Sequence, residues 1–250
     1  MELLVIVLCL LSERFWVHTR SHQRFHWFLA YGSRLSACLR AVFSYMHPWV
    51  ILAFTVLPIW LGAMLVWHGI QHVLFGVLGL LFSLGTFYYC LGPVNPFYPV
   101  HAKAVAHLTD EDLGVYLAEV NGQLFAVLTW YLVAGPLGLV AYRLISVSQR
   151  LSMVHRPAIF LTQLLDWVPA RMTALLYLLV GSFQTGFSVY RKRFFSAPSH
   201  NDVLLSDCGL AALSLEHRRK KSMRHAERLV EHATIIFLVL MALCTLVAWF

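Results

Sequence analysis

Long uncharged apolar stretches constrain this chain more than any other feature. A membrane-spanning helix needs about 20 mostly apolar residues, and every backbone polar group inside the bilayer must be satisfied internally. Three stretches have that length and polarity, namely Trp49 to Trp67, Val73 to Leu91 and Leu124 to Tyr142. A fourth stretch, Thr234 to Phe250, is slightly short but carries no charge. We therefore predict an all-α, polytopic membrane protein with four to five transmembrane helices.

The composition agrees with a location in a membrane. Hydrophobic residues make up 59% of the 250 residues and charged residues only 12%, whereas a soluble domain carries about 25% charged residues. We expect one membrane domain over residues 1–250 rather than separate soluble domains. The net charge of +7 is explained by basic connections on the cytoplasmic side of a membrane.

The distribution of arginine and lysine predicts which connections face the cytosol. Residues 12–48 and 92–123 should be cytosolic amphipathic or helical connections, with Thr109 as a helix cap, and residues 191–233 a basic cytosolic connection. The loop from Arg143 to Arg171 contains four arginines yet would emerge on the outside. Either that loop lies outside despite its charge, or one segment is re-entrant.

The stretch LLDWVPARMTALL, residues 164–176, places an acid and a base between two short apolar runs. Pro169 lacks a backbone donor and disfavours helical geometry in the residue before it, which predicts a broken or re-entrant helix around Asp166 to Arg171, with Pro169 at the break. Ionisable residues at membrane depth usually face a cavity or a partner, so these two charges are candidates for a binding site. The alternative is that they sit at the membrane interface, cap two helix ends and pair with each other.

A second candidate is the stretch NGQLFAVLTWYLVAGPLGLVAYR, residues 121–143. Gly135 and Pro136 should kink this helix, and a kink can leave carbonyl groups available to a ligand. Asn121 and Arg143 mark its two ends. The alternative is that glycine and proline are simply common in membrane helices and that Arg143 reaches for the interface.

Metal and thiol chemistry find little support in the sequence. His18, His22 and His26 are spaced four apart, which can suit zinc, but nothing fixes a further ligand. Their aromatic and basic neighbours indicate instead an amphipathic helix in the headgroup region, so we predict no metal site. The five cysteines are scattered without metal or redox spacing, and we interpret them as free thiols.

Two basic runs, RKRFF and HRRKK, lie in the third connection. Basic clusters beside membrane helices attract anionic lipid headgroups, and we predict membrane lipid as a partner there. No folded reader of nucleic acid is visible, so we predict no nucleic-acid partner. The sequence also lacks a glycine-rich phosphate loop, a G-x-S-x-G elbow and an HExxH motif, and we predict no cofactor.

The block LLDWVPARMTALLYLLVG resembles the signature of the AmpE family of bacterial inner-membrane proteins, whose distant relatives are the cobalamin-biosynthesis enzymes CobD and CbiB. The N-terminal run ending in SERFW and the stretch VNGQLFAVLTWYLVAGPLGLVAYRL are similar to the family in order and spacing. The resemblance implies a multi-pass protein of the bacterial inner membrane with a signalling or modulating role in β-lactamase induction and cell-wall recycling. Carried over by position, it also implies a common polar pocket, with the candidate ligand-binding residues Glu13, Arg14, Asn121, Tyr142, Arg143, Asp166, Arg171 and Asn201.

The resemblance leaves the activity open. The enzyme branch joins a corrinoid acid to an amino alcohol with ATP, but where those enzymes carry a Ser-Pro-Asn-Ala block this chain has SHNDVLLSDCGLAAL and retains Asn201. An AmpE-type modulator without catalysis is therefore our first hypothesis, and a CobD-like amide-forming ligase is the second. A transporter of anionic muropeptide-like solutes ranks third, because a transporter should have related halves and the sequence shows no such symmetry. A protein partner or a homo-oligomer is compatible with all three.

Overall fold

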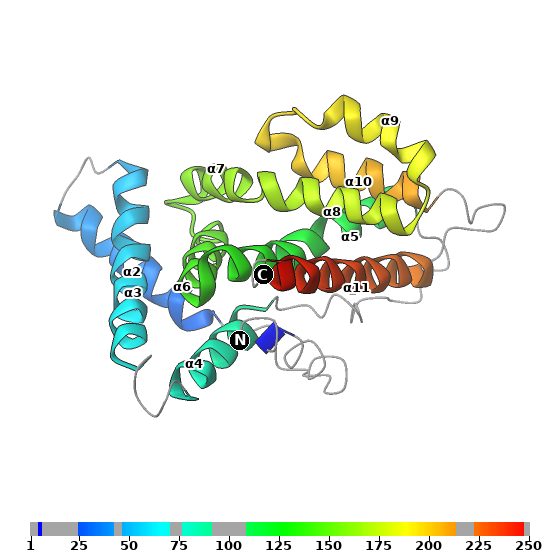
Figure 1. The fold of residues 1–250 in the computed structure, drawn as a ribbon. Coiled ribbons are helices and arrows are strands. Elements are labelled where there is room, and N and C mark those ends of the chain that lie inside the picture. Colours follow the sequence, from blue (N-terminus) through cyan, green and yellow to red (C-terminus); the bar gives the residue numbers. More distant parts are fainter. Residues whose placement is uncertain are drawn as a thin grey trace. The chain divides into compact units, whose positions relative to one another are not determined.

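The computed structural model describes residues 5–6, 25–42, 47–70, 77–91, 109–213 and 223–247. Every regular element in these ranges is a helix, which confirms the predicted all-α class. The chain divides into two compact units. Unit 1 comprises Met1–Pro93 with Val127–Leu165, and unit 2 comprises Val94–Ala126 with Asp166–Phe250 (Figure 1).

Unit 1 contains α2 (His26–Val42), α3 (Pro48–Ile70), α4 (Val77–Cys90), most of α6 (Ala126–Ser148) and α7 (His155–Leu165). Its apolar core joins α2, α3, α6 and α7 through buried side chains that include Phe28, Ile51 and Leu144. Gly32 allows α2 to lie close to the Leu151 side chain, because a Cβ atom at residue 32 would be only 2.6 Å from Leu151 Cδ1. Close contact between many such side chains stabilises the core by van der Waals attraction.

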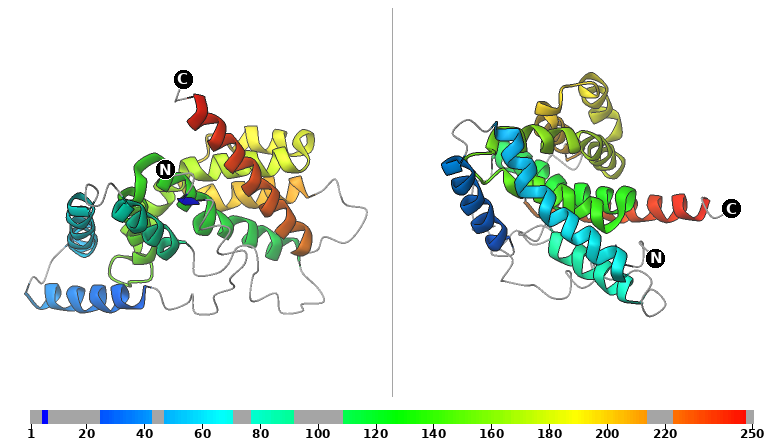
Figure 2. Two further views of the ribbon diagram at one scale, coloured as in Figure 1. Left: turned by 60° about the horizontal axis from the view of Figure 1, so that its bottom comes forward. Right: turned by 90° about the vertical axis from the view of Figure 1, so that its left-hand side faces the viewer.

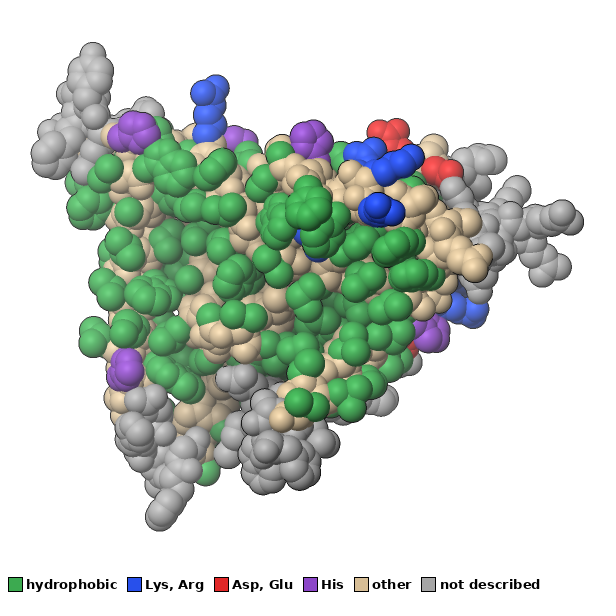
Figure 3. Space-filling view, turned by 45° about the horizontal axis from the view of Figure 1, so that its top comes forward, with side chains coloured by type: hydrophobic (Ala, Val, Ile, Leu, Met, Phe, Trp, Pro, Cys, Tyr) green, Lys and Arg blue, Asp and Glu red, His purple; other side chains and the backbone are tan. Residues whose placement is uncertain are grey.

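Two helices in the described residues are long and apolar enough to cross a membrane. One is α3, and the other is the continuous 39-residue helix Asp110–Ser148, formed by α5 (Asp110–Val120), the π-helical turn η3 (Asn121–Phe125) and α6. Hydrophobic side chains cover much of the face shown in Figure 3. Within the described residues, the helices that could cross a membrane are fewer than the four to five predicted.

The other two predicted spans lie only partly within the described residues. The predicted span Val73 to Leu91 contains α4, and residues 71–76 before this helix lie outside the described residues. The predicted span Thr234 to Phe250 falls on α11 (Met223–Val247), whose first turns carry charged residues. Residues 248–250 at the end of that span also lie outside the described residues.

The predicted kink in the second long helix is confirmed at Gly135. This residue has φ = 66° inside α6, a left-handed conformation that is easily reached only by glycine. Pro136 follows without a backbone donor, so a regular helical hydrogen bond is absent there. Near the kink, the indole N–H of Trp60 donates to the Leu137 carbonyl at 3.1 Å, which ties α3 to α6 within unit 1.

Unit 2 is built from α5, η3, α8 (Trp167–Val180), α9 (Phe183–Arg193), the short η4 (Pro198–His200), α10 (Asn201–Ala212) and α11. The helix α10 packs against α5, α8 and α9, while α11 lies against α5 and α8 (Figure 2). The predicted cap at Thr109 is confirmed, because its hydroxyl accepts from Asp112 N–H and the Asp112 carboxylate accepts from the Thr109 backbone in return. This reciprocal capping fixes the start of α5.

Unit 2 depends on a close backbone approach at Gly181, the residue after α8. A Cβ atom at this position would lie 2.4 Å from the Ala212 carbonyl oxygen and 2.8 Å from its carbon, both of which are backbone atoms at the end of α10. The Ser182 N–H donates to the same carbonyl at 3.2 Å. The two helix ends therefore cannot separate without loss of a hydrogen bond.

We predict that Gly181→Ala lowers the free energy of unfolding by about 1–3 kcal/mol, because the backbone of α10 must shift to admit a methyl group. Thermal unfolding of the purified protein in detergent measures the change. Gly62→Ala on α3 is the matched control, since a Cβ atom at Gly62 meets nothing within 4 Å. Equal melting temperatures for the two variants would contradict the close approach.

Candidate functional site

The break predicted near residues 166–171 lies at Asp166. The helix α7 ends at Leu165 and α8 begins at Trp167, with the half-buried Asp166 as the residue between them. The position predicted for Pro169 was wrong, because this residue lies inside the first turn of α8 rather than at the break. Backbone N–H groups in a first helical turn have no acceptor within the helix, so proline is tolerated there.

Arg171, one turn into α8, is the centre of the polar cluster in unit 2. Its side chain is only 4% exposed. All five guanidinium N–H donors find acceptors within the chain: Nε donates to the Phe194 carbonyl, Nη1 to the Trp167 carbonyl and to Asn201 Oδ1, and Nη2 to the carbonyl and the hydroxyl of Ser196. These hydrogen bonds hold the connection between α9 and α10 against α8. We call them the Arg171 clamp.

Every acceptor around Arg171 is neutral. Three are backbone carbonyls, at 3.1 Å for Phe194, 3.0 Å for Trp167 and 2.8 Å for Ser196. The guanidinium carbon also lies 4.2 Å from the centre of the Trp167 ring, where the electron-rich face of the indole stabilises a cation. The indole N–H of Trp167 donates to the Ser196 carbonyl at 3.2 Å, so this ring is held in place as well. Asp166 is not among the hydrogen-bond acceptors of Arg171.

A second set of polar contacts joins α8 to the π-helical turn η3. The Thr173 hydroxyl donates to Asn121 Oδ1 at 2.9 Å, and both residues are buried. The Tyr177 hydroxyl donates to the Leu117 carbonyl at 3.0 Å. The Leu117 carbonyl can accept this bond because the Asn121 N–H donates to Ala118 instead of continuing the α-helical pattern. The last turn of α5 and the π turn η3 together supply the polar groups that α8 contacts.

The structure brings together some of the residues predicted for a common pocket. Arg171 and Asn201 are in direct contact, and Asn121 and Asp166 belong to the same unit. Tyr142 and Arg143 belong to unit 1, where Tyr142 stacks on Trp130 and Arg143 lies over the Phe25 ring at 6.0 Å. The remaining pocket candidates, Glu13 and Arg14, lie outside the described residues, and so do His18 and His22 of the histidine series.

His26 is exposed at the start of α2. No group of three or more potential metal ligands occurs among the residues that the structure describes. Burial and the charge of Asp207 raise the pKa of Cys208 to about 12, so this buried residue is a neutral thiol at physiological pH. A thiol in that state is a poor nucleophile.

Four residues of the polar cluster were not predicted, and they are Trp167, Thr173, Tyr177 and Ser196. Three of them, Trp167, Thr173 and Tyr177, could have been recognised from their spacing along the helix. Trp167 lies four residues before Arg171, and Thr173 lies four residues before Tyr177, a spacing that places each pair on one helix face. Ser196 carried no such signal, because its contact with Arg171 spans 25 residues.

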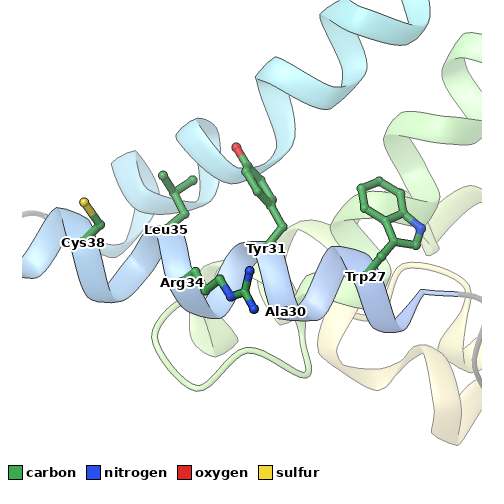
Figure 4. A pocket seen from close by; sticks show the side chains of 6 residues that line it. All are labelled: Trp27, Ala30, Tyr31, Arg34, Leu35 and Cys38. Carbon is green, nitrogen blue, oxygen red and sulfur yellow. The ribbon is translucent and has the colours of Figure 1, made fainter.

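Two surface hollows are lined by described residues of unit 1. One, of about 430 Å³, is almost wholly apolar and is lined by residues of α3, α4 and α6 with Phe25 and Trp27. The other, of about 520 Å³, is lined by six residues that all come from α2, including Arg34 and Tyr31 (Figure 4). A hollow that runs along a single helix offers few converging polar groups, so the Arg171 cluster remains the candidate functional site.

Comparison with known proteins gives a partial similarity. The chain is 31% identical over 121 aligned residues to the cobalamin biosynthesis protein CobD of Chromobacterium violaceum, and the match covers 44% of this chain. It covers 38% of the CobD sequence, so the chain spans well under half of that relative. No protein-family model matches the chain, and no solved structure matches it. The similarity supports a distant relationship to CobD proteins over part of the chain.

We predict that Arg171→Lys lowers the free energy of unfolding by about 2–4 kcal/mol, because a lysine ammonium cannot reproduce the five directed donors and leaves buried carbonyls without partners. Thermal or denaturant unfolding in detergent measures the loss. The matched control is Arg193→Gln in the same unit, which removes an ion pair with Asp207 whose side chains are 40% and 36% exposed. An exposed pair contributes at most about 1 kcal/mol, so a larger loss in the control than in Arg171→Lys would contradict the clamp.

Proposed function

We propose that this chain is a multi-pass protein of a bacterial inner membrane, in which a CobD-like scaffold binds a polar ligand and modulates β-lactamase induction without catalysis. The membrane location is supported by the two long apolar helices and by the partial similarity to CobD. The polar cluster around Arg171 in unit 2 supports the second part of the proposal, that the chain acts without catalysis.

The observation that carries the proposal is the saturation of Arg171. A ligase would need cationic groups to hold the phosphate or carboxylate of an activated acid. Each donor of Arg171 already binds an acceptor of the chain, so a ligand would have to break one of these bonds to reach the guanidinium. Arg171 acts instead as a positioning residue that holds Asn201 and the connection after α9.

Asn121 is the residue best placed to contact a ligand. Its side-chain oxygen accepts from Thr173, while its amide nitrogen donates no hydrogen bond within the described part of the chain. An amide with a fixed oxygen presents its two N–H donors in a defined direction. A donor pair of this kind favours a carboxylate or carbonyl oxygen of a ligand.

A CobD-like ligase is the second candidate, favoured by the 31% identity to CobD over 121 residues. The two proposals differ in what the purified protein binds. A ligase must bind ATP and an acid substrate, whereas a modulator needs neither. Saturable binding of ATP together with a corrinoid acid by the detergent-purified chain would favour the ligase, and binding of neither would leave the modulator.

We predict that Asn121→Asp abolishes the effect of the chain on β-lactamase induction, because it retains the oxygen that accepts from Thr173 and removes both amide donors. The measurement is induced β-lactamase activity in cells that lack the native gene and carry each variant at equal abundance. Thr173→Val is the matched control, since it removes the structural hydrogen bond and leaves the donors of Asn121 in place. The control should retain induction while it loses about 1 kcal/mol of stability. Normal induction by Asn121→Asp would overturn the proposed ligand contact.

A further inference from the structure

The surface of α9 in unit 2 carries an aromatic stripe that the proposed ligand site does not use. Phe183, Phe187, Tyr190 and Phe194 are spaced four, three and four residues apart, so they share one face of the helix. Their rings contact one another in sequence, with centroid distances of 5.0 Å, 6.3 Å and 5.4 Å. The first two rings are 42% and 41% exposed.

A different face of α9 fastens it to unit 2. Gly186 is buried, and a Cβ atom there would lie 2.1 Å from Leu178 and 3.4 Å from Ala211, so this side of the helix meets α8 and α10. Arg193, two turns further along, pairs with Asp207 of α10 at 2.8 Å. The aromatic stripe therefore runs beside the packed face and remains largely uncovered in its first half.

Two cations accompany the stripe at the end of α9. Arg191 and Lys192 are exposed and form no ion pair within the described residues, whereas the neighbouring Arg193 is neutralised by Asp207. Figure 3 shows Lys and Arg side chains beside hydrophobic side chains on the face of the molecule that contains α9. Aromatic rings next to free cations match the boundary between acyl chains and anionic headgroups.

The Arg171 clamp adds a protruding ring to this surface. The guanidinium binds the carbonyls of Phe194 and Ser196, which turns the backbone on both sides of Phe195 toward α8. The Phe195 side chain between them is 87% exposed. An apolar ring fixed in that position is costly in water, and it becomes favourable where acyl chains surround it.

From these contacts we infer that α9 is an interfacial anchor that lies in the plane of an anionic membrane surface. Phe183, Phe187 and Phe195 enter the acyl boundary, and Arg191 and Lys192 bind the phosphates of anionic phospholipids. With 11 residues, α9 is too short to cross a bilayer, which agrees with a position in the interface. This inference rests on the proposed membrane location but is independent of the ligand site.

The test uses the full chain reconstituted into vesicles of phosphatidylcholine with phosphatidylglycerol, with its native cysteines replaced. An environment-sensitive fluorophore is attached to a single cysteine in each of three variants. These are Phe187→Cys on the stripe, Ser188→Cys at an exposed position of α9 off the stripe, and Leu61→Cys at an exposed position of α3. We expect lipid-borne quenchers to act on the probe at 187 and aqueous iodide to act on the probe at 188. The probe at 61 reports whether α3 lies in the bilayer.

The charge and aromatic contributions are tested in the same vesicles with the probe at 187. Arg191→Gln and Lys192→Gln should each lower the docking equilibrium of α9 about fivefold, and vesicles of phosphatidylcholine alone should have a similar effect on the unmodified sequence. Phe195→Ser should weaken docking about tenfold. Arg150→Gln, an exposed cation of unit 1, is the matched control and should change nothing.

The following outcomes would overturn the anchor. Iodide quenching at 187 as strong as at 188 would place the stripe in water, and lipid quenching at both would place α9 inside the bilayer. Protection of the probe at 187 from both quenchers would mean that a protein covers the stripe. If lipid-borne quenchers act on the probe at residue 61 but not on the probe at residue 187, only the anchor is rejected. If they do not act on the probe at residue 61, the proposed membrane location is rejected as well.

Discussion

The buried guanidinium of Arg171 is the interaction on which the arrangement of unit 2 depends. A cation that is 4% exposed must find a partner for each of its donors, since a charge removed from water without compensation costs several kcal/mol. The chain provides neutral acceptors from three places: the preceding turn of α8, the end of α9 and the start of α10. Because these acceptors are mostly backbone carbonyls, they fix the path of the chain. The exposed position of Phe195 and the contact with Asn201 both follow from that path.

The helices of unit 2 approach closely enough for this clamp to form because small residues lie between them. Gly209 of α10 faces Leu117 of α5, where a Cβ atom would lie 2.6 Å from Leu117 Cδ1, and Gly114 of α5 faces Ser206. Small residues at helix crossings are the usual means of close packing in membrane proteins, where lipid gives little hydrophobic incentive for helices to associate. Polar contacts such as that of Thr173 in α8 with Asn121 in η3 join further elements of the same unit. Close packing and internal hydrogen bonding therefore reinforce each other here.

Features with a local cause were predictable from the sequence. The all-α class followed from apolar length, the cap at Thr109 from its three following acids, and the kink at Gly135 from the Gly-Pro pair. Features that depend on distant partners were not predictable. Pro169 suggested a break at its own position, but a proline in a first turn is compatible with the helix and only the packing of α8 shows where that helix begins. The neutral partners of Arg171 could not be found either, because backbone carbonyls have no signature in the sequence.

The clamp also limits what sequence similarity can say about activity. Arg171 lies in the block from which the resemblance to the AmpE family was predicted, and such a block would ordinarily suggest shared chemistry. In this chain every donor of Arg171 is used to hold its own fold. A residue with that role would be needed for folding in any protein built on the same scaffold, whether the protein is a ligase or a modulator. Evidence on activity must therefore come from groups that the fold leaves available, and among the described residues of the cluster the amide nitrogen of Asn121 is the best example.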